Sequence, residues 1–252
     1  MNGLQINNEK VRIASMVHDL KNPVAILLNN LNLILNRTKD FGPLTAKQKN
    51  RIERALRATK TIGIYVNNIL EIGRSESGLI TFTEFKLSHL VLETIIDVID
   101  FDHSVLSNRK EMEKLEVLKK VAQKENLNVM ISKLLWPMKF ESDFSKIKQI
   151  LTNLLTNGLK FKNHYVELEI THDDGHLIFV VKDDGEGIPP KYHKKIFESY
   201  FKMKNSFESS VRGHGIGLAA VAVLVKDLEG ELSLESSKNK GSIFTTKIPV
   251  KQ

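Results

Sequence analysis

The stretch QILTNLLTNGLKF, Gln149–Phe161, decides how the C-terminal part of this chain folds. Its large apolar residues recur at helical spacing, whereas Asn153, Asn157 and Lys160 fall on a second, polar side of the same predicted helix. Asparagine is a poor helix former, so two of them four residues apart call for an explanation. Their carboxamide oxygens suit Mg²⁺, and a lysine can contact phosphate as a point charge. The alternative is an ordinary amphipathic helix that carries asparagine on its polar face.

Two glycine-rich motifs follow that helix. DDGEG, Asp183–Gly187, comes directly after an apolar run, and Asp183 can accept a hydrogen bond from an exocyclic amine such as that of adenine. GHGIG, Gly213–Gly217, precedes an apolar helix and is a candidate phosphate-facing helix N-terminus. Each motif taken alone is also compatible with a simple turn. The glycines expected to let the backbone approach a ligand are Gly185, Gly187, Gly213, Gly215 and Gly217.

A third motif, HDLKNP, lies in a long N-terminal helix with Pro23 inside it, which should bend the helix. His18 points about 130° away from the centre of the apolar seam, so its imidazole should reach solvent, with Asn22 one turn further on the same side. Asp19 follows directly and can orient the ring proton, an arrangement that suits a phosphoryl-accepting nucleophile. The alternative is a surface histidine with an unrelated proline nearby.

The first 78 residues are predicted to form an antiparallel helical hairpin. A turn at Arg37–Leu44 precedes a capping box, Thr45–Gln48, that starts the second helix. Two helices shield only part of their apolar seams, whose large side chains contribute about 1.5–3 kcal/mol each when buried. We therefore expect a homodimer that completes a four-helix bundle. The seams are Ile13, Val17, Leu20, Val24, Leu27, Leu31 and Ile34, and then Ile52, Leu56, Thr59, Ile62, Val66 and Ile69.

After a linker at 79–86, residues 87–252 are predicted to form an α/β sandwich, which makes the chain α+β overall. The sandwich should contain one antiparallel-rich sheet with turns at Asp173–Gly175 and Ser236–Gly241. The segment Pro189–Arg212 is a candidate mobile lid. Helices are expected at Ser88–Phe101, Arg109–Glu125, Ser145–Phe161, Lys191–Tyr200 and Gly217–Leu228, and strands at Tyr165–Thr171, Leu177–Lys182, Glu231–Glu235 and Ser242–Pro249.

The composition is that of an ordinary globular protein, with 41% apolar and 27% charged residues. The net charge of +7 does not indicate a nucleic-acid partner, because lysines alternate with glutamates as on solvated helix faces. The absence of cysteine excludes disulfides and suits a reducing cytoplasm. No apolar run reaches the ~20 residues of a membrane span, so we expect a soluble, cytoplasmic chain or the cytoplasmic part of a longer one.

Taken in order, these motifs resemble those of the histidine kinases of two-component signalling, and the resemblance covers nearly the whole chain. HDLKNP is similar to the family's H box, which implies that His18 is phosphorylated and that Asp19 is its acid–base partner. Asn22 matches the position that orients water for dephosphorylation of the partner protein.

The resemblance also assigns the nucleotide site. The N box implies contacts from Asn153, Asn157 and Lys160 to ATP and Mg²⁺, with Asn153 and Asn157 at the metal. The family's ATP-binding domain is of the Bergerat type. One of its other boxes corresponds to Asp183, Gly185 and Gly187, which implies that Asp183 binds adenine. Another corresponds to Phe197 and Phe201 in IFESYF, and a third to Gly213, Gly215 and Gly217.

The implied function is ATP-dependent autophosphorylation of His18 and phosphotransfer to an aspartate of a response regulator receiver domain, with a reverse phosphatase activity suggested by Asn22. The chain departs from the family pattern at His214, commonly Thr, at Gly158, commonly Ala, and in an insertion around 100–116. An upstream sensor domain or protein outside this chain would supply the input. The rival functions are a GHKL-type ATPase switch, which normally has a Glu where Gln149 lies, and a non-catalytic signalling scaffold.

Overall fold

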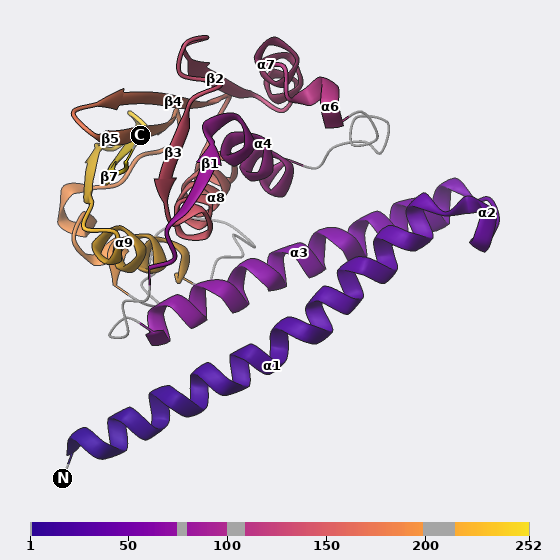
Figure 1. Cartoon of the computed structure of the whole chain (residues 1–252), viewed down its shortest axis with the longest axis horizontal. Helices are drawn as coiled ribbons and strands as arrows, with labels where there is room; N and C mark the ends of the chain where they lie inside the picture. Colours follow the sequence, from indigo (N-terminus) through magenta and orange to yellow (C-terminus); the bar gives the residue numbers. More distant parts are fainter. Residues whose placement is uncertain (1, 75–79, 100–108, 199–214, 252) are drawn as a thin grey trace. The chain divides into compact units, whose positions relative to one another are not determined.

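The computed structural model describes residues 2–74, 80–99, 109–198 and 215–251 (Figure 1). Contacts divide the chain into two compact units, Met1–Ser77 and Gly78–Gln252. The first unit is helical, and the second combines helices with two sheets. The α+β class predicted from the sequence is thereby confirmed. Among the described residues, no helix is both long enough and apolar enough to cross a membrane.

The first unit is an antiparallel pair of long helices, α1 (Asn2–Asn36) and α3 (Ala46–Arg74) (Figure 1). The predicted capping box at the start of α3 is confirmed: the backbone N–H of Gln48 donates to Oγ1 of Thr45 at 3.3 Å, and the backbone N–H of Thr45 donates to Oε1 of Gln48 at 2.9 Å. The predicted turn before it contains a one-turn helix, α2 (Thr38–Phe41).

The apolar seams of this hairpin are only partly covered within one chain. Leu56 and Val66 on α3 are buried, but Leu20 and Leu27 on α1 remain 51% and 50% exposed. Ile62, on the α3 seam, is 48% exposed. The side chains of Ile13 and Val17 lie outside the described residues. Three of the eleven seam residues whose side chains are described thus remain exposed in the single chain, as expected for a hairpin that needs another surface.

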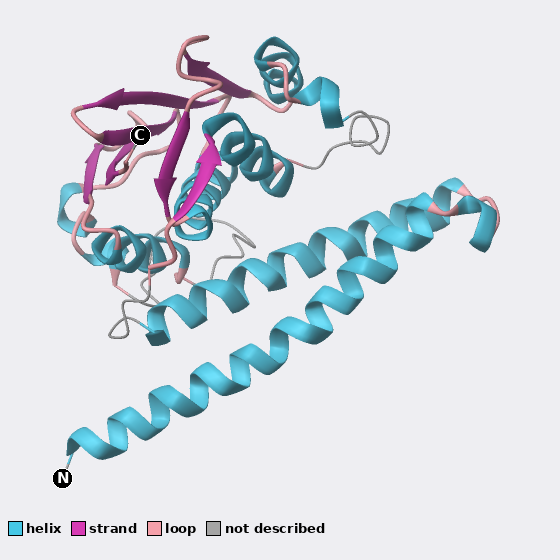
Figure 2. Ribbon diagram, viewed as in Figure 1, coloured by secondary structure: helices cyan, strands magenta, loops and turns pink. Residues whose placement is uncertain are grey.

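The second unit is built around a five-stranded sheet of order β2-β4-β5-β7-β6 (Figure 2). The β2–β4 pair is parallel and the other pairs are antiparallel. The turn predicted at Asp173–Gly175 is confirmed by positive φ angles of 44° at Asp174 and 70° at Gly175. The strands are β2 (Leu127–Ile131), β4 (Val166–Asp173), β5 (His176–Asp183), β6 (Glu231–Ser236) and β7 (Ser242–Pro249).

A second, two-stranded sheet pairs β1 (Thr83–Lys86) with β3 (Lys139–Ser142) in antiparallel register. The sequence predicted a single sheet without β1, β2 or β3, and this prediction was wrong. These strands are four or five residues long. A period-two alternation over so few residues is a weak signal, and tertiary pairing decides whether such segments become strands.

Helices α8 and α9 pack against the large sheet, and α4 packs against α8 (Figure 2). Alternation along β5 places Leu177, Phe179 and Val181 in the core beneath them, each at most 1% exposed. The helices of this unit are α4 (Leu87–Val98), α6 (Arg109–Met112), α7 (Leu115–Lys124), α8 (Phe144–Phe161) and α9 (Gly217–Asp227).

Two helix predictions need correction. The helix expected over Arg109–Glu125 is broken into α6 and α7, because Lys114 is extended (φ −76°, ψ 121°) and the preceding carbonyl of Glu113 accepts a hydrogen bond from Nε1 of Trp136 at 2.9 Å. The helix expected over Lys191–Tyr200 is instead two 3₁₀ turns, Pro190–Tyr192 and Lys195–Phe197. Within these turns only Ile196 is buried, so no apolar stripe supports an α-helix.

We predict that Phe179→Ala lowers the free energy of unfolding of the second unit by about 3–5 kcal/mol, because it opens a cavity in the core. Phe179 is 0% exposed, whereas the matched control Phe82→Ala removes a ring that is 54% exposed. Urea unfolding followed by the fluorescence of Trp136, the single tryptophan, reports on this unit alone. Equal losses in the two variants would contradict the assignment of Phe179 to the core.

Candidate functional site

Helix α8 is oriented by its N-cap and by its apolar face. Oδ1 of Asp143 accepts a hydrogen bond from the backbone N–H of Lys146 at 3.0 Å, the expected N-cap contact. Ile147, Ile150, Leu151 and Leu154 are all 0% exposed against the core. This burial fixes the rotation of α8 about its axis and therefore the direction in which its asparagines project.

The predicted polar residues of α8 differ in exposure. Asn153 is 3% exposed and Asn157 is half-buried. Lys160 is exposed, and its ammonium lies 4.6 Å from the centre of the Phe161 ring. Gly158 is buried, and a β-carbon there would lie 3.1 Å from Cγ1 of Val166, so close packing against β4 explains why glycine suits this position.

The start of α9 meets the asparagines of α8. A β-carbon on Gly217 would lie 3.5 Å from Oδ1 of Asn153 and 3.9 Å from Nδ2 of Asn157. The N-cap residue Ile216 forms no side-chain cap at this end of α9, and the first backbone N–H groups of a helix are donors that suit an anion. Two motifs that are far apart in the sequence therefore converge on one place. Gly215, with φ 68°, belongs to the same segment, whereas Gly213 lies outside the described residues.

Asp183 ends β5 as a buried carboxylate, 6% exposed. Its Oδ1 accepts a hydrogen bond from the backbone N–H of Gly185 at 2.9 Å. Burial raises the pKa of Asp183, while hydrogen bonds from Gly185 and Ser242 act in the opposite direction. A carboxylate held in such a dry place gains from any further donor that reaches it, such as the amine of a bound base.

The glycines around Asp183 make close contacts with the chain's own backbone. A β-carbon on Gly185 would collide with the carbonyl oxygen of Phe161, at the end of α8. One on Gly187, whose φ is 70°, would collide with the carbonyl oxygen of Ser237 in the β6–β7 turn. The close approach that the structure describes at these two positions is therefore to backbone, and it holds β5, α8 and the β6–β7 turn together.

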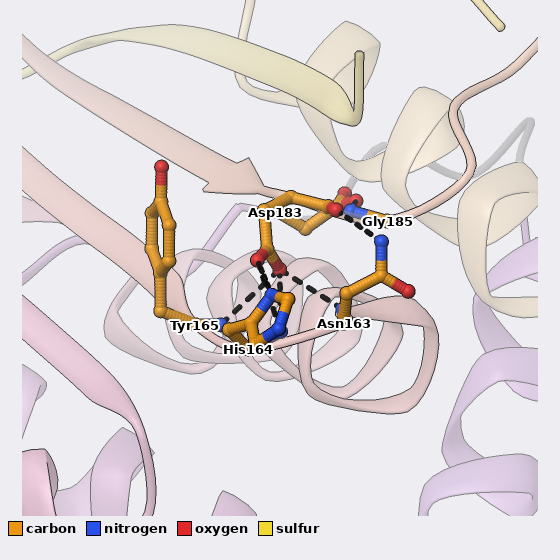
Figure 3. A network of polar contacts seen from close by, with 6 residues as sticks. Asn163, His164, Tyr165, Asp183 and Gly185 are labelled. Carbon is orange, nitrogen blue, oxygen red and sulfur yellow. Dashed lines mark hydrogen bonds and ion pairs between the residues drawn. The ribbon is translucent and has the colours of Figure 1, made fainter. Parts of the chain in front are cut away.

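A second carboxylate, Asp184, was not singled out by the sequence analysis. It accepts hydrogen bonds from the backbone N–H groups of Asn163, His164 and Tyr165 at 2.9–3.1 Å, and from Nδ1 of His164 at 2.9 Å. Figure 3 shows these three residues gathered beside Asp183 and Gly185. Desolvation raises the pKa of Asp184, but the hydrogen bonds outweigh it and lower the pKa to about 2.

The two neighbouring carboxylates therefore lie in different environments. Asp184 anchors the loop after α8 to the end of β5, and this anchor sets the position of Asp183 relative to α8. The only sequence signal was the Asp183–Asp184 doublet itself, which does not say which carboxylate faces a ligand.

The remaining predicted nucleotide residues are only partly described. Phe197 is half-buried and packs edge-on against Phe244, with ring centres 6.4 Å apart. Phe201 and most of the predicted lid, Pro189–Arg212, lie outside the described residues. Among the described residues, no cluster of three or more His, Cys, Asp or Glu side chains could hold a metal ion.

The residues of the predicted phospho-acceptor lie in the first unit. Asp19 and Asn22 are exposed on α1. His18, directly before Asp19, and Pro23, directly after Asn22, belong to the same helix. The backbone of His18 is helical, and its side chain lies outside the described residues. The structure thus keeps HDLKNP in a single helix.

A groove of about 540 Å³ lies at the end of β2 and beside β4. None of the predicted site residues lines this groove, so the groove lies outside the predicted site. Its lining is Met130, Ile131, Ser132, Leu134, Leu135, Met138, Glu169, Ile170, Thr171 and His172.

Family models match both units. Residues 12–78 match the His Kinase A (phospho-acceptor) domain, and residues 142–252 match the histidine kinase-, DNA gyrase B- and HSP90-like ATPase. The first match contains HDLKNP, and the second contains α8 and both glycine-rich motifs. The chain belongs to the histidine kinase family. It carries the two domains of a sensor histidine kinase catalytic core.

Relatives of known name agree with this membership of the histidine kinase family. The chain is 27% identical over 94% of its length to the circadian input-output histidine kinase CikA of Synechococcus elongatus, of which it covers 29%. It is 28% identical over 94% of its length to the aerobic respiration control sensor protein ArcB of Escherichia coli, of which it covers 28%. The chain thus spans less than a third of the length of these relatives.

Solved structures share the fold of this kinase core. Full-length ShkA in complex with AMPPNP gives a TM-score of 0.58 at 20% identity, covering 95% of this chain and 45% of that one. The Acinetobacter baumannii histidine kinase AdeS gives a TM-score of 0.52 at 16% identity, covering 93% of this chain and 98% of that one. At these identities the likeness concerns the fold.

We predict that Asp184→Asn lowers the free energy of unfolding of the second unit by about 1–3 kcal/mol at pH 7, because charge-assisted hydrogen bonds to three N–H groups are weakened. The folded pKa of about 2 lies below the ordinary 3.8, so the contribution of this carboxylate is present above pH 4 and is lost as the pH falls toward 2. Urea unfolding at several pH values measures the difference.

The matched control for that prediction is Asp173→Asn, which neutralises an exposed carboxylate at the last residue of β4. It should leave the free energy of unfolding nearly unchanged. A difference between wild type and Asp184→Asn that stays constant from pH 7 to pH 3 would show that the charge on Asp184 is not what stabilises the loop.

Proposed function

We propose that this chain binds ATP with Mg²⁺ in its second unit and transfers the γ-phosphoryl group to His18. The observation that carries the proposal is the meeting of α8 and α9, where Gly217 lies beside Asn153 and Asn157. A helix N-terminus suits phosphate, and the carboxamides beside it suit a phosphate-bound magnesium ion. Membership of the histidine kinase family supports the same assignment.

In this proposal the residues of the second unit bind and orient the nucleotide. Asn153 and Asn157 would hold Mg²⁺, which when bound neutralises charge on the phosphates. Lys160 contributes a positive charge near them, and Gly213, Gly215 and Gly217 bring backbone close to the phosphates. Asp183 accepts a hydrogen bond from the adenine amine. Gly185 and Gly187 hold Asp183 in place, and Phe197 and Phe201 border the site.

The reaction needs a neutral imidazole whose attacking ring nitrogen has a free lone pair that can reach the γ-phosphorus. A ring nitrogen of His18 forms the N–P bond while the bond from the γ-phosphorus to the bridging oxygen breaks, and ADP leaves. Asp19 orients or accepts the proton of the other ring nitrogen, which becomes acidic as the imidazole gains positive character. The exposure of Asp19 and Asn22 on α1 supports the accessibility of this segment.

Further steps follow from the same family membership. We propose that the phosphoryl group passes from His18 to an aspartate on the receiver domain of a response regulator, and that Asn22 orients water for the reverse phosphatase activity. We also propose that α1 and α3 dimerise into a four-helix bundle, because half-exposed Leu20, Leu27 and Ile62 would then be covered. No observation favours the ATPase switch or the non-catalytic scaffold.

The experiment that tests this function is incubation of the whole chain with Mg²⁺ and ATP labelled in the γ-phosphate. We predict an acid-labile, alkali-stable label on the wild type and a loss of more than about 99% of it in His18→Gln, because glutamine has no nucleophilic ring nitrogen. His176→Gln, a substitution at the first residue of β5, is the matched control and should keep the label. Label retained by His18→Gln would overturn the phospho-acceptor assignment.

For the dimer, we predict that Leu20→Glu combined with Leu27→Glu shifts the chain from dimer to monomer, because two charges would be buried in the apolar seam. Light scattering after size-exclusion chromatography measures the mass. Leu134→Glu is the control, because Leu134 is 85% exposed but lies in the second unit. A wild-type chain that is monomeric at about 100 μM, far above a micromolar dissociation constant, would refute the proposed bundle.

A further inference from the structure

Asp143 uses its two carboxylate oxygens for two different segments. Oδ1 accepts a hydrogen bond from the backbone N–H of Lys146 at 3.0 Å and caps α8. Oδ2 accepts one from the backbone N–H of Thr81 at 3.0 Å, from a residue 62 positions earlier in the chain. The side chain is buried, with Asp143 only 5% exposed. Capping alone does not require this arrangement, because a serine or threonine hydroxyl caps a helix equally well.

Thr81 belongs to the linker that follows the helical hairpin. It comes seven positions after Arg74, the last residue of α3, and two before the start of β1. β1 then pairs with β3 along its whole length, with Thr83 opposite Ser142. Ser142 immediately precedes Asp143 and is 1% exposed. The linker is therefore joined to the start of α8 by a strand pair and by the Asp143 contact next to it.

A further contact continues from α8 to α9. Nζ of Lys146 contacts Oδ2 of Asp227 at 2.5 Å, with both side chains nearly buried at 12% and 13% exposure. Asp227 is the last residue of α9, whose first residue, Gly217, lies beside Asn153 and Asn157. The two helices thus run antiparallel, and Lys146 joins them at the end opposite the proposed phosphate site.

We propose that Asp143 is a positioning residue that couples the linker to the proposed nucleotide site. Thr81, Asp143, Lys146 and Asp227 form a continuous chain of polar contacts from the linker to both helices of that site. A packed helix moves as a rigid element, so a shift of the linker at Thr81 displaces the asparagines further along α8. By linkage, a nucleotide held between α8 and α9 in turn stabilises the Thr81 contact. This inference rests on the proposed function.

The test uses Asp143→Asn, because asparagine is as good an N-cap as aspartate. With its oxygen on the N–H of Lys146, its NH₂ group faces the N–H of Thr81, and two donors cannot bond. Asp143→Ser is the second variant, because a single hydroxyl retains only the cap. Glu84→Gln is the matched control: it breaks an exposed ion pair to Lys139 at 2.8 Å between the same strands, β1 and β3.

The first readout is amide hydrogen exchange of the whole chain with and without AMPPNP and Mg²⁺. We expect AMPPNP to slow exchange at Thr81 about tenfold in wild type and in Glu84→Gln, within the usual range of coupling between sites. In both Asp143 variants the Thr81 response should disappear, while Lys146 stays protected. Exchange at Thr81 that ignores AMPPNP in wild type, or that responds equally in Asp143→Asn, would overturn the proposal.

The second readout separates positioning from simple destabilisation. In Asp143→Asn we expect kcat of autophosphorylation to fall about 5- to 10-fold, with KM for ATP within about twofold of wild type. A rise in KM that matches the fall in kcat would instead indicate a damaged nucleotide site and would overturn the positioning role. A wild-type chain that binds AMPPNP but forms no phosphohistidine refutes the proposed phosphotransfer, and the Thr81 response then still decides the coupling. A chain that binds no AMPPNP overturns both.

Discussion

The second unit depends on the burial of one face of α8 against the sheet. Ile147, Ile150 and Leu154 have no exposed surface, and they sit among the strands' inward-facing residues. Rotating or sliding this helix would expose large apolar groups, each worth about 1.5–3 kcal/mol. The same constraint determines where the opposite residues point. Asn153 and Asn157 meet the start of α9 because the apolar face leaves them no other direction.

Hydrogen bonds at both ends of α8 fix its position in addition to the packing of its apolar face. At its start, the two oxygens of Asp143 are shared between the helix and the linker. At its end, Asp184 accepts hydrogen bonds from three backbone N–H groups of the loop that leads into β4. Burial raises the pKa of the neighbouring Asp183, whereas hydrogen bonds lower that of Asp184. Two adjacent carboxylates at the end of β5 thus differ in environment: Asp183 is buried, and Asp184 is held by backbone N–H groups.

Long periodic segments were predictable, and short ones were not. The helix over Ser145–Phe161 and the strand pair around Ser236–Gly241 appear within a residue or so of their predicted limits, because they carry strong apolar periodicity and turn residues. β1 and β3 have no such signal and exist because they pair with each other. The described part of the predicted helix Lys191–Tyr200, up to Glu198, buries only Ile196, and it forms 3₁₀ turns.

The amino-acid sequence by itself determined the class of fold, the order of the motifs and the residue types suited to a nucleotide, since these follow from local periodicity and side-chain chemistry. Tertiary structure alone decided which motifs meet: Gly217 beside Asn153, and Thr81 on Asp143. It also showed that Gly185 and Gly187 are required by contacts with the backbone of Phe161 and Ser237. Such contacts join residues distant in the chain, and no local pattern encodes a distance between them.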